Sequence, residues 1–156
     1  ESGRRQINRS CNISITSIHA PSLSLLEKLK SIKIFSNYIT TKIQQQLDGI
    51  VENTRNSFGL VNGSIDTNLG LFRANNTIYL QNHPFVAQDA YLHVNELEPT
   101  AQGIPIRIYC YTTVTDWVSH ESVQSEIFEH LALMAPRFEL DLYQIIQDST
   151  THTSHI

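Results

Sequence analysis

The chain has 156 residues, of which 40% are hydrophobic and 17% charged, and its formal net charge is -4. This length fits one domain, and the apolar fraction is high enough to build a core, which excludes an intrinsically disordered chain. The acidic balance argues against nucleic acid as the main partner. Charged residues interrupt every long apolar stretch, so no segment is predicted to cross a bilayer. Two widely spaced cysteines, Cys11 and Cys110, exclude a disulfide framework or zinc motif and favour a reducing compartment.

The first third of the chain is predicted to hold one strand and a helical insertion. Apolar and polar residues alternate from Ile7 to Ile15, which is typical of a strand buried on one face. Ser22 is then a candidate N-cap, and apolar residues recur at three- and four-residue steps. This pattern predicts one or two helices over roughly 22–52, with a bend or split near Ser36, inside an insertion covering about 22–57. The apolar stripe of the insertion either folds onto the domain or is partly left for a partner.

The next element is a small hairpin over 58–65, predicted from the Asn-Gly pair that it contains. A second helix is expected to begin with Asp66 or Thr67 as its cap and to end at His83-Pro84, because proline cannot continue a helix. The remaining predicted elements, in chain order, are strands at 91–97 and 104–114 joined by a turn at 99–103, a helix from Thr115 or Asp116 to Pro136, a last strand at 138–146 and a polar tail at 147–156.

Without the insertion and the hairpin, the predicted order is βαββαβ, the split βαβ arrangement of ferredoxin-like folds. The predicted class is therefore α+β, ferredoxin-like, with a helical insertion after the first strand and a small hairpin. In this arrangement the first and third strands are central neighbours. The alternation then places Cys11 and Cys110 on the helix-covered face, as two inert core thiols or as a redox pair.

The seven histidines do not have the spacing of a metal site. His152 and His155 would hold a metal only weakly, in a polar tail. His83 is expected to cap the end of its helix, and His120 and His130 are expected on the solvent-exposed face of the third helix. The sequence contains no nucleophile motif or phosphate-binding loop. We therefore expect no catalytic, cofactor-binding or metal-binding residue, and no enzymatic activity.

One face of the strand at 104–114 carries Arg107, Tyr109 and Tyr111 and is predicted to lie opposite the helices. A bare sheet face with aromatic side chains can contact another subunit, a ligand or RNA, and RNA would require more positive charge. The two interpretations that remain are a subunit contact and ordinary scattered surface tyrosines. Together with the insertion, this face favours an interaction protein over an enzyme.

Several runs resemble bacterial miniconductance mechanosensitive channels, which belong to the small-conductance (MscS-like) superfamily. The similarity covers roughly 3–146. It departs from the family pattern at three positions: Ser64 and Ile65 stand in place of two basic residues, and Asn95 stands in place of an arginine. The runs that carry the resemblance are Gly3-Arg4-Arg5-Gln6-Ile7-Asn8-Arg9-Ser10, Leu25-Leu26-Glu27-Lys28-Leu29, Leu60-Val61-Asn62-Gly63, Thr67-Asn68-Leu69-Gly70-Leu71-Phe72-Arg73-Ala74, Gly103-Ile104-Pro105-Ile106-Arg107-Ile108-Tyr109-Cys110-Tyr111 and Ile127-Phe128-Glu129-His130-Leu131.

The resemblance implies that residues 1–146 are the C-terminal cytoplasmic α/β domain of such a channel, which forms a vestibule beneath the pore. The intact protein would be a homo-oligomer, usually a heptamer, at the cytoplasmic face of the bacterial inner membrane. Its own transmembrane and β-domain segments, absent from this chain, would be the main partners. The superfamily opens under membrane tension and releases ions and small solutes during hypo-osmotic shock. The domain alone is expected neither to insert into a membrane nor to conduct, and no cofactor is implied.

Two other functions are compatible with the same predicted fold. One is a stand-alone ferredoxin-like regulatory module that binds a small ligand at a dimer interface. The other, a small hydrolase, has less support because the fold alone does not specify function. The start at Glu1, without an initiating Met or a signal-peptide core, is interpreted as a piece of a longer protein.

Overall fold

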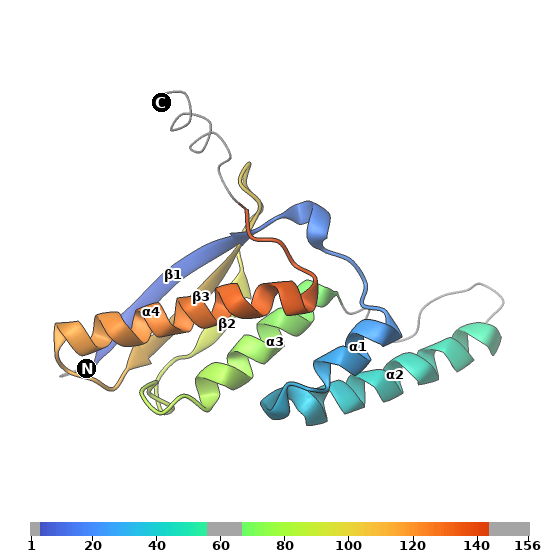
Figure 1. Ribbon diagram of the computed structural model, residues 1–156, viewed down its shortest axis with the longest axis horizontal. Helices are drawn as coiled ribbons and strands as arrows, with labels where there is room; N and C mark the ends of the chain where they lie inside the picture. The colour runs from blue at the N-terminus through green and yellow to red at the C-terminus, as the bar shows by residue number, and fades with distance from the viewer. Residues whose placement is uncertain (1–3, 56–66, 144–156) are drawn as a thin grey trace, which may run out of the picture.

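The structure is a computed structural model that describes residues 4–55 and 67–143. In this part, helices pack on one face of a three-stranded antiparallel sheet (Figure 1), which confirms the expected α+β class. None of the helices in the described part is long and apolar enough to span a membrane. The predicted hairpin at 58–65 and the tail at 147–156 lie outside the described residues. The elements are β1 (Arg5–Ile13), η1 (Ile15–Ser17), α1 (Leu23–Leu29), η2 (Lys33–Phe35), α2 (Ser36–Arg55), α3 (Asn68–Gln81), β2 (His93–Glu96), β3 (Ile104–Thr112), α4 (Trp117–Met134) and η3 (Ala135–Phe138).

The strands lie in the order β1-β3-β2, and β3 is antiparallel to both neighbours. Arg5 pairs with Thr112 at one end of β1, and Ile13 pairs with Ile104 at the other. The predicted contact between the first and third strands is therefore confirmed. Only β3 is central among the described strands, however, and β1 lies at an edge of the sheet.

The strand predicted for 138–146 is wrong over its described part. The chain leaves α4 in the short helix η3, and Glu139 then adopts a left-handed conformation with φ of 61°. The ring of Phe138 is completely buried at the end of this short helix. Only an isolated antiparallel bridge between Ile13 and Leu142 pairs this segment with β1.

The predicted helix starts agree with the structure because three polar side chains cap them. The side chains of Ser22, Thr67 and Asp116 each accept a hydrogen bond from the backbone N–H three residues later. The helical insertion is split as expected, although the break covers residues 30–35 and so precedes Ser36, where α2 begins. Ile15 is not part of the first strand and lies exposed in η1.

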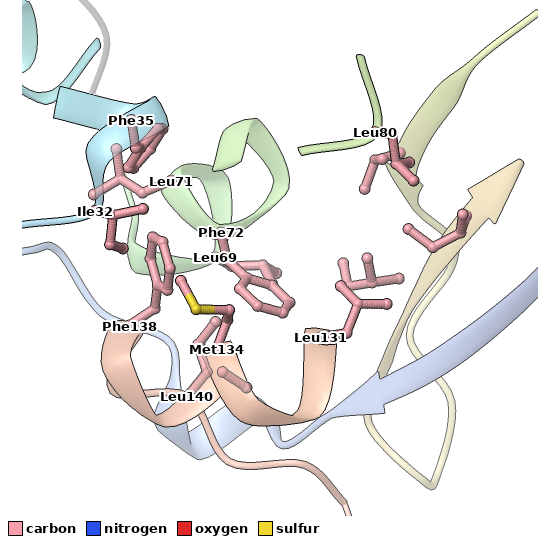
Figure 2. Packing of buried hydrophobic residues seen from close by; sticks show 14 of the residues in the cluster. Ile32, Phe35, Leu69, Leu71, Phe72, Leu80, Leu131, Met134, Phe138 and Leu140 are labelled. Carbon is pink, nitrogen blue, oxygen red and sulfur yellow. The ribbon is translucent and has the colours of Figure 1, made fainter. Parts of the chain in front are cut away.

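The core lies between the helices and one face of the sheet. Ile106, Ile108 and Cys110 of β3 are fully buried on that face. Figure 2 shows Phe72 of α3 and Phe138 beside the end of α4, with their rings edge to face and centroids 5.5 Å apart. Each large apolar side chain buried in this way contributes about 1.5–3 kcal/mol.

The insertion joins this core through its first half. The ring of Phe35 and the side chain of Ile39 are fully buried, and Ile43 packs against the same cluster. Leu47, one helical turn further along α2, is exposed. The apolar stripe of the insertion thus folds onto the domain near α1 and leaves at least one large apolar side chain uncovered.

A buried amide at the start of α3 joins three segments that are distant in the sequence. Asn68 Nδ2 donates to the carbonyl oxygens of Ser17 (3.0 Å) and Phe138 (2.9 Å). Asn68 Oδ1 accepts from the backbone N–H of His19 at 2.9 Å, and the backbone N–H of Asn68 donates to the carbonyl of His19. The connection after β1, the start of α3 and the end of η3 are therefore held by one side chain.

Two further asparagines on α3 are equally buried but lack such partners. The side chains of Asn75 and Asn76 are each 1% exposed, and neither amide makes a hydrogen bond within the described residues. A buried amide that is not hydrogen-bonded costs stability, whereas a fully bonded one does not. The three asparagines thus provide a matched comparison within one helix.

We expect Asn68→Ala to lower the free energy of unfolding by about 3 kcal/mol, because it leaves the buried carbonyls of Ser17 and Phe138 and the part-buried N–H of His19 without this partner. Asn76→Ala removes the same atoms from an equally buried position and should cost about 1 kcal/mol or less. Urea unfolding of both variants measures the difference. Equal losses would show that the Asn68 bonds contribute nothing beyond packing.

Candidate interaction face

The face of the sheet opposite the helices is the surface that the sequence singled out. Arg107, Tyr109 and Tyr111 alternate along β3 with fully buried residues and remain half-exposed, so their predicted orientation is confirmed. The register of β2 places His93 beside Tyr109 and Asn95 beside Arg107. We call these residues, together with Gln6 of β1 and Tyr91, the aromatic face.

The tyrosine side chains of the aromatic face hold one another in place. The ring of Tyr91, which is 57% exposed, meets the ring of Tyr109 edge to face at 5.1 Å. Tyr109 in turn meets Tyr111 edge to face at 6.0 Å, with their hydroxyl oxygens 3.5 Å apart. Gln6 Nε2 donates to the Tyr109 hydroxyl at 2.6 Å. These contacts fix the rings before any partner arrives, which lowers the entropic cost of binding.

The aromatic face also carries a positive charge that is held by its neighbours. The guanidinium carbon of Arg107 lies 5.4 Å from the ring centroid of Tyr109. Arg107 Nε donates to Asn95 Oδ1 at 3.3 Å, so Asn95 positions the arginine beside it. The hydrogen bond between the Tyr109 and Tyr111 hydroxyls raises the pKa of the Tyr111 phenol. Such a surface suits a polar partner with aromatic groups or hydrogen-bond acceptors.

Sequence reasoning missed the contribution of the second strand to this face. Tyr91 was seen only as the start of a strand, yet it has the most exposed ring of the cluster. Its contact with Tyr109 depends on the cross-strand register, and alternation within one strand carries no information about its neighbours. The clustering therefore became visible only in the folded sheet.

The structure corrects the expected role of His83. The imidazole of His83 is buried, and its Nε2 lies 3.0 Å from Glu126 Oε1 on α4. Its Nδ1 accepts a hydrogen bond from the backbone N–H of Phe85 at 3.0 Å, which assigns the ring proton to Nε2. His83 therefore links α3 to α4 and does not cap the carbonyls of its own helix.

His120 and His130, which were also predicted to lie at the surface, are not on the solvent-exposed face of α4. His120 is buried, with Nδ1 3.0 Å from the hydroxyl of Thr112 on β3. His130 stacks on the ring of Tyr79, with centroids 3.7 Å apart, and its Nε2 is buried without a partner in the described residues. Both predictions were wrong because the buried side of α4 is wider than its apolar residues indicate. His120 and His130 lie at the edges of that side and pack against β3 and α3 respectively.

Burial changes the proton affinity of this region. Desolvation, with a smaller contribution from Glu126, raises the pKa of Tyr79 to about 12. Desolvation lowers the pKa of both His120 and His130. Burial therefore favours the neutral forms of Tyr79, His120 and His130.

The two cysteines lie on the helix-covered side, as predicted. Cys110 is fully buried, and desolvation raises the pKa of its thiol to about 12. Cys11 is partly buried and packs against the core, and burial raises the pKa of its thiol as well. Neither thiol is poised to form a thiolate, which agrees with the interpretation of two core thiols.

Within residues 4–55 and 67–143, no group of three or more His, Cys, Asp or Glu side chains is arranged to hold a metal ion. His152 and His155, the weak candidates in the tail, lie outside the described residues. No protein-family model matches the chain.

The lowered pKa values of His120 and His130 predict that stability falls in mild acid. The unfolded chain binds protons at the ordinary histidine pKa of about 6.5, whereas the folded protein does so only at lower pH. This stability is therefore present above about pH 6.5 and is lost as the pH falls through the lowered pKa. His130→Gln should reduce the loss of unfolding free energy between about pH 7.5 and about pH 5.5, and adding His120→Asn should reduce it further. Urea unfolding at each pH tests this, and an unchanged slope in both variants would contradict it.

Proposed function

We propose that this chain is the C-terminal cytoplasmic vestibule domain of a miniconductance mechanosensitive channel, a member of the MscS-like superfamily. In the whole channel it would contribute subunit contacts and part of the vestibule through which solutes reach the pore. The gate and the tension sensor would lie in the transmembrane segments. The domain would thus serve the response to hypo-osmotic stress without being an enzyme.

The aromatic face is the observation that carries this proposal. A sheet covered by helices on one side and bearing an ordered cluster of Tyr91, Tyr109 and Tyr111 on the other presents a surface suited to another protein. In a ring of identical subunits, every copy of such a surface finds a partner. The run at 103–111, which resembles the channel family, contains Tyr109 and Tyr111 and supports this proposal.

The finer fold that we propose is ferredoxin-like. The order β1-β3-β2, with β3 antiparallel to both neighbours, is the order of three of the four strands in a split βαβ arrangement. The bridge between Ile13 and Leu142 lies on the side of β1 where such a fold has its fourth strand. The alternative function is a stand-alone ferredoxin-like regulatory or small-ligand-binding module, which has the same fold. It differs from the channel domain because no membrane-spanning segments would precede it.

The first test is therefore the gene. We expect the stretch that encodes the residues before Glu1 to specify several apolar segments, the last of them a Gly/Ala-rich helix of pore-lining type. Such segments are the membrane-embedded area that tension sensing requires. A start codon directly before Glu1, or another water-soluble domain there, would overturn the channel proposal and favour the stand-alone module.

The second test concerns the aromatic face as a subunit contact. Tyr91→Arg adds charge and bulk to the exposed ring position and should raise the dissociation constant of self-association by about tenfold. Leu133→Arg is the matched control, because Leu133 is 73% exposed on α4, away from the sheet. Sedimentation equilibrium over a range of concentrations measures both variants, and circular dichroism checks that each is folded. Equal self-association of the two variants would remove the aromatic face from the proposed contact.

A further inference from the structure

Positive charge is concentrated in the helical insertion of this otherwise acidic chain. All four lysines of the chain lie in the insertion, and they are Lys28, Lys30, Lys33 and Lys42. The only acidic residue among residues 22–47 is Glu27, so this segment has a formal charge of +3. Because the whole chain carries -4, all other residues together carry -7. Such an asymmetry between segments indicates a surface that attracts anions.

The turn between α1 and α2 presents part of this charge together with an apolar side chain. Ile32 and Phe35 of the turn are buried, and the ring of Phe35 stacks on Tyr38 with centroids 5.0 Å apart. Lys33 and Ile34, which lie between them, point outward, and Ile34 is 47% exposed. Figure 1 shows this turn at the lower margin of the molecule. The buried residues thus hold a convex turn that exposes a lysine beside an isoleucine.

Two neighbouring cations extend the positive surface around this turn. Arg137 Nη2 donates to Ser31 Oγ at 2.9 Å, and Lys28 and Arg137 line the same groove between α1 and η3. On α2 the ammonium of Lys42 lies 5.5 Å from the ring centroid of Tyr38. The basic patch is defined as Lys28, Lys30, Lys33, Ile34, Lys42 and Arg137.

The carboxylates that border the basic patch leave most of its charge uncompensated. Glu27 lies 3.5 Å from the ammonium of Lys30, and Glu139 lies 3.1 Å from the imidazole of His19. Three other cations of the patch have no carboxylate within 4.0 Å in residues 4–55 and 67–143, and they are Lys28, Lys33 and Arg137. These charges are therefore available to an anionic partner.

We propose that the basic patch binds the surface of a bilayer that contains anionic phospholipids. The cations pair with headgroup phosphates, and Ile34 enters the boundary between the headgroups and the acyl chains. Lysine binds phosphate as a point charge, without the fixed geometry of a bidentate arginine pair, which suits a fluid layer of headgroups. A convex turn with an exposed apolar side chain also fits a deformable surface better than a rigid one. The contact stays at the surface, since no helix of the described residues is able to span a membrane.

Sedimentation of the protein with lipid vesicles tests the proposal. The probe is a vesicle of three parts phosphatidylcholine and one part phosphatidylglycerol, and the control vesicle is phosphatidylcholine alone. At about 0.1 M salt the Debye length is about 10 Å, so only charges close to the lipid contribute strongly. We expect saturable binding to the probe vesicle, weaker binding as the salt concentration rises, and at least tenfold weaker binding to the control vesicle, a factor of roughly ten that follows from the loss of two phosphate contacts.

A pair of variants tests the charge. Lys33→Gln should weaken binding to the probe vesicle by about fivefold, the contribution of one cation at an anionic surface. Arg9→Gln is the matched control, because it removes an equal charge from β1, where the guanidinium lies over the ring of Phe128. Binding by this control should be unchanged. Circular dichroism checks that both variants are folded.

A second pair of variants tests the apolar contact. Ile34→Ser should weaken binding by about tenfold, because the exposed part of the side chain no longer leaves water on binding. Val118→Ser is the matched control, since Val118 is 74% exposed at the start of α4, away from the basic patch. Its binding should equal that of the unmodified protein.

Several results would overturn the proposal. They are failure to bind the probe vesicle, equal binding to both vesicles, and equal binding by the two members of either pair of variants. Binding to a polyglutamate peptide without binding to the probe vesicle would identify an acidic protein segment as the partner instead. The argument for the bilayer uses only the charge and exposure of the basic patch. Its failure would leave the channel proposal intact, because the tests of that proposal concern the gene and the aromatic face.

Discussion

The amide of Asn68 is the constraint on which the arrangement of the helices depends. It bonds the connection after β1, the start of α3 and the end of η3, three segments that no continuous element joins. Because the amide is buried, each bond that is lost leaves a polar group without water to replace its partner. The same contact brings Phe138 over α3, where it meets the ring of Phe72 (Figure 2), and so closes the core on the side of the insertion.

Helices cover only one face of the sheet, and this leaves the other face exposed as a candidate binding surface. The buried face uses the apolar residues of β1 and β3 and leaves the other face to tyrosines that contact one another. The aromatic face presents ordered rings and therefore suits a folded protein surface.

Most elements were predictable because their signals are local. Helix starts at Ser22, Thr67 and Asp116 follow from polar side chains that bond to the next turn, and the strand faces of β3 follow from alternation. The last strand was not predictable in the same way. The apolar residues of 138–143 alternate as in a strand, but Phe138 is drawn into the core by contacts with α3 and η2 that arise from distant parts of the chain. The buried histidines of α4 were missed for the same reason, because their partners lie on β3 and α3.

The sequence by itself determined the α+β class, the order of the main described elements from β1 to α4, the caps and the outward orientation of Arg107, Tyr109 and Tyr111. Each of these depends on residues within a few positions of one another. Only the tertiary structure decided that Tyr91 joins the aromatic face, and that Asn68 is fully bonded while Asn75 and Asn76 are not. These features depend on register and on contacts across the chain, and the pairing of one segment with another is not encoded in the periodicity of either segment alone.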